Sequence, residues 1–184
     1  MKITVLFLFI ALAAGAQTNP VIASTVSNSP AGGDQSAGAR AEKIRTGCVA
    51  GRRVICGRIL QVLPGGLVVD SGYTDLLRPP LSNTWLVPGR VVASRPQSLI
   101  ESAEPGSPCV GVVMLTDLPK IRPGGPRPKL YDYVVLLGYP TGQATYTSVG
   151  TLQKTVRRFS ANLGKAVSQN FDAAEKAGAG SLTK

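Results

Sequence analysis

Glycine and proline divide this chain into short segments, and this division constrains its fold more than any other feature. The 184 residues include 21 glycines and 14 prolines, grouped in clusters such as Pro64-Gly65-Gly66 and Pro105-Gly106. Proline lacks a backbone donor and glycine favours turns, so both residues tend to end regular elements. The segments between the clusters are therefore expected to be short strands joined by turns.

These segments are rich in β-branched and other apolar residues. The strongest predicted strands are 53–63, 67–71, 109–116, 131–139 and, after a turn at Pro140-Thr141-Gly142, 143–149. Weaker strands are predicted at 84–87, 90–94 and 98–101, where neighbouring prolines favour sheet edges. The runs 112–116 and 133–139 are apolar on both faces, which is typical of central strands covered on both sides.

The hydrophobic period changes after Gly150. Residues 151–158 alternate as a strand does, whereas a longer apolar series has the spacing of one helical face. That series consists of Leu152, Val156, Phe159, Leu163, Val167 and Phe171. We predict a strand to about residue 158 and a helix over 161–177. This helix and the tail that follows it form a C-terminal region that covers 161–184.

About six to eight short strands, with turn signals every 8–12 residues, predict a mainly β fold: a small barrel or sandwich with a C-terminal helix. The β domain is expected to cover 43–160. Its opening pattern places Val54, Gly57, Ile59 and Val62 before a glycine turn and the apolar residues 67–69. This pattern resembles the first hairpin of small Greek-key barrels such as OB folds. An SH3-like barrel is the alternative small barrel for a chain of this kind.

The first sixteen residues have the order of a secretory signal peptide. Lys2 precedes an apolar run over 3–12, and Ala14-Gly15-Ala16 supplies small residues for cleavage. A second small-residue site ends at Ala23. The run is shorter than the ~20 residues of a membrane-spanning helix. We expect a secreted or periplasmic protein that does not span the membrane after cleavage, with residues 17–42 as a flexible Ser/Ala/Gly-rich linker.

Catalysis and metal binding are disfavoured by what the chain lacks. It has no histidine, which removes the commonest general base and the commonest metal ligand. Asp70-Ser71 and Thr116-Asp117 follow apolar strands and are explained by turn chemistry, while Glu101 and Glu104 flank a turn. The prediction is a protein without enzyme activity, metal or cofactor.

The three cysteines are Cys48, Cys56 and Cys109. Export permits a disulfide, and one bridge with one free thiol is the simplest arrangement. A Cys56–Cys109 bridge is one candidate, although the sequence leaves the pairing open. The alternative is three buried thiols that pack as small apolar residues.

Basic residues outnumber acidic ones by ten, and the pI is near 10.0. Such a balance favours an anionic neighbour, although it also serves solubility. Three groups of bases are candidates for anion binding: the Pro/Gly-rich loop over 118–129, the start of the first strand, and the last strand. Their members are Lys120, Arg122, Arg127 and Lys129; Arg52, Arg53 and Arg58; and Lys154, Arg157 and Arg158.

If the first and last strands pair, the second and third groups would form one patch. Stacking partners for a sugar or base would come from the aromatic residues. These are Tyr73, Trp85, Tyr131, Tyr133, Tyr139 and Tyr146. The leading hypothesis is a binding module for an anionic envelope component, such as a polysaccharide, or for nucleic acid. The alternative is a structural module of the envelope that binds a protein through its β edges or the Val156–Phe171 stripe.

Overall fold

A computed structural model describes residues 37–121, 123–148 and 150–179. The predicted signal peptide over 1–16 and most of the predicted linker lie outside the described residues, as does Arg122 of the basic loop. Within the described residues, no helix has the length and apolar character needed to cross a membrane.

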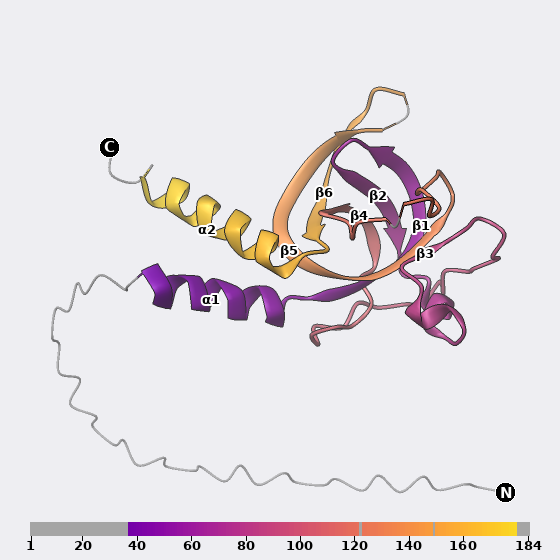
Figure 1. The fold of residues 1–184 in the computed structure, drawn as a ribbon, viewed down its shortest axis with the longest axis horizontal. Helices are drawn as coiled ribbons and strands as arrows, with labels where there is room; N and C mark the ends of the chain where they lie inside the picture. Colours follow the sequence, from indigo (N-terminus) through magenta and orange to yellow (C-terminus); the bar gives the residue numbers. More distant parts are fainter. Residues whose placement is uncertain (1–36, 122, 149, 180–184) are drawn as a thin grey trace, which may run out of the picture. The chain divides into compact units, whose positions relative to one another are not determined.

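The described chain contains one mixed sheet of six strands and two α-helices, so the prediction of a mainly β fold with a C-terminal helix is confirmed (Figure 1). The sheet order is β1-β2-β4-β6-β5-β3, and β1 pairs with β5 as well. Only β4 and β6 pair in parallel. The strands are β1 (Arg53–Leu63), β2 (Gly66–Ser71), β3 (Leu86–Val87), β4 (Gly111–Thr116), β5 (Tyr133–Thr147) and β6 (Gln153–Ser160).

The β1–β2 hairpin forms where the sequence predicts it, around Pro64-Gly65. Gly57 lies opposite Ser71 in this pair. A Cβ atom at Gly57 would lie 2.0 Å from the carbonyl oxygen of Asp70, so only glycine allows the two strands to approach this closely.

The turn predicted at Pro140-Thr141-Gly142 is wrong, because these residues form a bulge inside one long strand, β5. The partner of Pro140 on β6 is Phe159 and the partner of Gln143 is Arg157, so two residues of β5 face one of β6. Gly142 has φ 93°, and Thr141 is tied to Arg158 by side-chain hydrogen bonds. Proline and glycine occur at bulges as they do at turns, but a bulge bends the strand and does not reverse the chain.

The strands predicted at 90–94 and 98–101 are also wrong: this segment is irregular, and the strand predicted at 84–87 shortens to β3. Val92 is 96% exposed and Ile100 is 88% exposed. Their β-branched side chains therefore bury no surface that would stabilise a strand.

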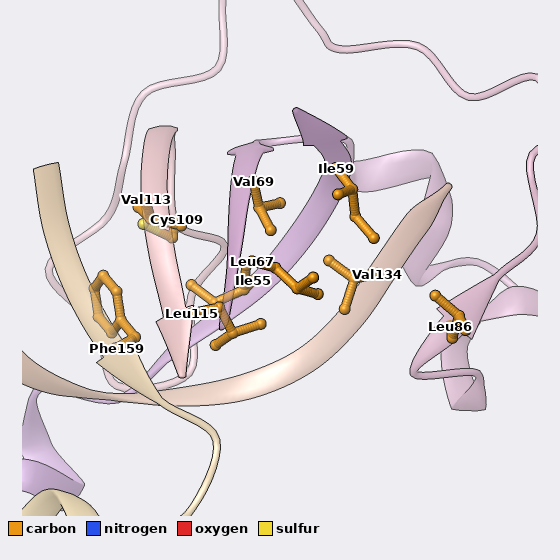
Figure 2. Packing of buried hydrophobic residues seen from close by; sticks show 10 residues of the cluster. All are labelled: Ile55, Ile59, Leu67, Val69, Leu86, Cys109, Val113, Leu115, Val134 and Phe159. Carbon is orange, nitrogen blue, oxygen red and sulfur yellow. The ribbon is translucent and has the colours of Figure 1, made fainter. Parts of the chain in front are cut away.

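Side chains from all six strands meet in an inner core, shown in Figure 2. Leu67 and Val69 of β2 face Leu115 and Val113 of β4 in the same register. Each fully buried side chain of this kind contributes roughly 1.5–3 kcal/mol. Ile55, Ile59, Cys109, Val134, Phe159 and Leu86 complete the cluster.

A second, outer core covers the other face of β1 and β5. It contains Cys56, Tyr73, Leu76 and Tyr133. The covering segment includes two short 3₁₀ helices, η1 (Thr74–Leu77) and η2 (Leu81–Asn83). Because β5 is covered on both faces, its run of consecutive apolar residues is explained as predicted.

The helices α1 (Ala37–Ala50) and α2 (Leu163–Ala179) lie side by side and antiparallel beside the sheet (Figure 1). The predicted C-terminal helix is confirmed, with its start two residues later. Helix α1 is a correction, since the prediction places residues 37–42 in the flexible linker and residues 43–50 in the β domain. Asn170 of α2 donates hydrogen bonds to the Cys48 sulfur (3.3 Å) and the Pro140 carbonyl oxygen (2.9 Å), so tertiary contacts hold α1 in place.

Candidate anion-binding site

The first and last strands do not pair: β1 pairs with β2 and β5, whereas β6 pairs with β4 and β5. The patch expected from such a pairing is therefore not formed in that way. Two of its arginines do meet, but they meet on a carboxylate of the protein itself.

Glu101 is the residue that joins them. Arg157 donates to both of its carboxylate oxygens at 2.8 Å, and the Arg53 side chain lies 3.5 Å from one of them. The hydrogen bonds from Arg157, opposed by partial burial, hold the pKa of Glu101 below its ordinary value. Such a bidentate, charge-assisted pair satisfies the arginine and leaves little of it for a ligand.

The remaining bases of these two groups are also engaged, with one exception. Arg52 donates to the Val49 carbonyl oxygen at the end of α1 (3.0 Å), and Arg158 donates to the Thr141 carbonyl oxygen on β5 (3.0 Å). The Arg58 guanidinium lies 5.6 Å from the ring centre of Tyr131, and its Nε is buried without a hydrogen-bond partner among the described residues. Lys154 is exposed on β6. The arginines of these two groups therefore have structural roles, whereas Lys154 forms no ion pair with another described residue.

The basic loop, residues 118–129, differs from both groups. Lys120, Arg127 and Lys129 are exposed, and none of them forms an ion pair with any other described residue. The loop connects β4 to β5. One pocket is lined both by Ile121 and Pro128 of the loop and by residues 62–67, so the loop lies beside the β1–β2 turn. The ion pair between Arg53 and Glu101 lies at the other end of β1, where the strand starts. Because β1 is roughly 30 Å long, the predicted basic groups do not form one patch.

Both ends of the basic loop are firmly held. Asp117 and Tyr131 have φ of 52° and 69°, a conformation that is unfavourable for residues other than glycine. The Asp117 carboxylate accepts hydrogen bonds from Ser160 (2.8 Å) and Thr116 (3.1 Å). The buried carboxylate of Asp132 accepts the amide N–H groups of Gly89 (2.8 Å) and Lys129 (2.9 Å). These bonds fix the base of the loop while its cationic side chains stay in solvent.

Three pockets border the loop, and Lys120 lines two of them. One of these two, of about 370 Å³, lies between the loop and residues 83–86 and includes Trp85. The other, of about 410 Å³, includes Asp117, Asn162 and Lys165. Sequence reasoning missed Asn83, Asn162 and Lys165, because only the fold brings η2 and the start of α2 to the loop.

Three of the six aromatic residues predicted for stacking are buried, and Tyr139 is half-buried. Tyr73 and Tyr133 form a buried edge-to-face pair with ring centres 5.7 Å apart, and Tyr146 is buried as well. Burial and the nearby Asp70 carboxylate raise the pKa of Tyr73. Trp85 and the 59%-exposed Tyr131 are left as the aromatic rings nearest the basic loop.

The three cysteines are buried free thiols, so the candidate Cys56–Cys109 bridge is not formed in the structure. Cys109 belongs to the inner core and Cys56 to the outer one. Burial raises the pKa of each of these two thiols to about 11. Both residues pack as small apolar side chains, the alternative that the sequence left open.

Polar residues examined for catalysis have structural roles. The Ser71 side chain is fully buried and accepts the Cys56 amide N–H (3.1 Å). Asp70 accepts hydrogen bonds from Tyr73 (3.2 Å) and Arg95 (2.8 Å). Among the described residues, no group of three or more acidic or cysteine side chains is arranged to hold a metal ion.

Comparison of the chain with protein-family models, with curated proteins and with solved structures found no significant match in any of the three. Its function must therefore be argued from the residues and their geometry.

Proposed function

We propose that this domain is a binding module without catalytic activity and that its ligand is an anionic polymer, a polysaccharide or a nucleic acid. The observation that carries the proposal is the state of the basic loop. Lys120, Arg127 and Lys129 are exposed and lack ion partners among the described residues, whereas Arg53 and Arg157 are paired with Glu101.

The construction of the loop supports this proposal. Prolines at 119, 123, 126 and 128 restrict its backbone, and Asp117 and Asp132 fix its ends. A loop that is already restricted loses less conformational entropy when a ligand orders it. Cationic side chains on such a loop suit a chain of regularly spaced negative charges.

We further propose that the strands close into a five-stranded barrel of the OB type. The pairings β1–β2, β2–β4, β4–β6, β6–β5 and β5–β1 support this proposal, since each of these five strands pairs with two others of the ring. OB folds bind oligonucleotides and oligosaccharides on the face of the second and third strands and on the loops that follow the first and fourth strands. Here the basic loop follows the third strand of the proposed ring, so it would add a separate surface to that fold.

An envelope location remains part of the proposal and rests on residues 1–16. A protein-interaction role is the alternative, and the apolar stripe that motivated it is used within the domain. Phe159 is 3% exposed in the inner core, and α2 packs against α1, β5 and β6. The stripe therefore favours internal packing over a partner.

The test measures binding to heparin and to an oligothymidylate of about 12 nucleotides as salt is raised from about 50 to 200 mM. The variant K120A/R127A/K129A removes the three loop charges. We expect it to bind at least about tenfold more weakly at low salt. For the oligothymidylate, the slope of log K against log salt should become about 2 units shallower, since each lost phosphate contact removes about 0.7.

The matched control is R40A/K43A/K176A, which removes the same charge from exposed positions on α1 and α2, outside the three candidate groups. It should bind like the wild type. Equal weakening by the two variants would show that only net charge matters. Absence of binding by the wild type at low salt would refute the proposal.

A further inference from the structure

The pocket beside the basic loop contains the single tryptophan of the chain. Its volume of about 370 Å³ lies within the range of small-ligand sites. Trp85 and Leu86 line this pocket, together with Lys120, Ile121 and Pro126 of the basic loop. An aromatic ring, apolar side chains and one cation thus share one cavity outside the proposed ring of strands.

Trp85 is held as a rigid platform. Its carbonyl oxygen accepts the Val135 amide N–H at 2.9 Å, and Leu86, the next residue, pairs with Val134 on β5. The Trp85 side chain is half-buried and packs against the inner core. An indole supported in this way lines the pocket without needing to be ordered by a ligand.

The lining favours a flat apolar ring over a sugar. The residues that line this pocket include no Asp or Glu, so no carboxylate is present to accept hydrogen bonds from the hydroxyl groups of a sugar. A nucleobase, by contrast, has a π-face that stacks on an aromatic side chain whatever its identity. Asn83 and Thr84 line the same pocket, and their side chains carry groups that can form hydrogen bonds with a base edge.

The basic loop that lines this pocket also carries further exposed cations. Lys120 lines the pocket itself, and Arg127 and Lys129 follow in the same loop. In a single strand, each base is joined to a phosphate, so a stacked base brings negative charges beside it. A sulfated polysaccharide would need the cations but not the ring.

We propose that single-stranded nucleic acid is the ligand, with one base stacked on Trp85 and the adjoining phosphates on Lys120, Arg127 and Lys129. This inference rests on the proposed function and names its ligand. It predicts that binding affects the one tryptophan of the chain directly.

The experiment follows Trp85 fluorescence while the full chain is titrated with an oligothymidylate of about 12 nucleotides. We expect quenching that saturates with binding. W85L should weaken binding by about 5- to 150-fold, the effect of losing one stacked base, while W85F should retain most of the affinity. Melting curves of both variants show whether they are folded.

An abasic oligonucleotide of the same length is the matched ligand control, because it keeps the phosphates and removes the bases. It requires only the wild-type protein, so it decides the question even if W85L fails to fold. We expect it to bind more weakly than the oligothymidylate and to leave Trp85 emission unchanged.

Two outcomes overturn the inference while leaving the proposed function standing. One is tight oligothymidylate binding with unchanged Trp85 emission and equal affinity for the abasic strand. The other is heparin binding that quenches Trp85 and is lost in W85L, which would assign the pocket to a polysaccharide. Absence of binding to both polymers overturns the inference and the proposed function together.

Discussion

Glu101 and Asp132 each fix a loop to the sheet, one at the start of β1 and the other beside Ile59, but they use different donors. Glu101 is held by the side chains of Arg157 and Arg53. Asp132 is held by the backbone amides of Gly89 and Lys129, and its own carbonyl oxygen accepts the Ile59 amide N–H (2.8 Å).

This difference decides which cations are available to a ligand. Around Glu101, arginines serve as structural donors and are neutralised by the carboxylate. Around Asp132, backbone amides perform the same task, so Lys129 contributes its N–H while its ammonium group remains exposed. A net charge read from a sequence does not distinguish these two situations, although only the second provides a binding surface.

The largest effect is expected from D132A. It removes a buried acceptor and leaves two amide donors without their partner, which costs about 2–3 kcal/mol. Urea unfolding would measure the loss. D132N keeps one oxygen acceptor and should lie between D132A and the wild type. A D132A protein as stable as the wild type would show that Asp132 does not anchor the loop.

A smaller effect is expected from E101Q, about 1–2 kcal/mol, because its ion pairs are partly exposed. The pKa of Glu101 is lowered in the folded protein, so its contribution is complete above the unfolded value near 4.3 and is lost as pH falls through the folded pKa. Unfolding curves of the wild type and E101Q should therefore converge in acid.

Salt sharpens the same comparison. About 1 M NaCl should reduce the penalty of E101Q, since it screens partly exposed charges, and leave that of D132A unchanged. An E101Q penalty that persists unaltered below about pH 3 would show that the ion pair is not its source.

The inner parts of the fold were predictable because local pattern and tertiary environment agree there. β1, β2, β4 and α2 lie close to their predicted ranges, and the double-sided apolar character of β5 was correctly interpreted. The Pro140-Thr141-Gly142 bulge was not, since the sequence does not reveal that Thr141 bonds to Arg158 on the neighbouring strand. Helix α1 was also missed, because contacts with α2 stabilise it and its own amphipathic pattern is weak.

The candidate site was predictable only in its local part. The basic loop is contiguous in sequence, so its bases and prolines could be identified together. The pairing of Arg157 with Glu101 and the approach of Trp85 to Lys120 join residues that are distant in sequence. No spacing rule connects such residues before the strand order is known.

The smallest effect is expected at Cys109, whose environment includes Glu101 and Arg157. Burial raises the pKa of this thiol to about 11 from 9.0, so its thiolate fraction near pH 8 should fall about 100-fold and it should react slowly with thiol reagents. In E101Q, which loosens the segment leading to Cys109, the reaction should be a few-fold faster, while Cys56 in the outer core should be unaffected. Variants with one cysteine each would separate the two rates.

In denaturant and without a reductant, all three cysteines are expected to react with a thiol reagent. A count of one reactive thiol would instead establish a disulfide and reopen the Cys56–Cys109 pairing.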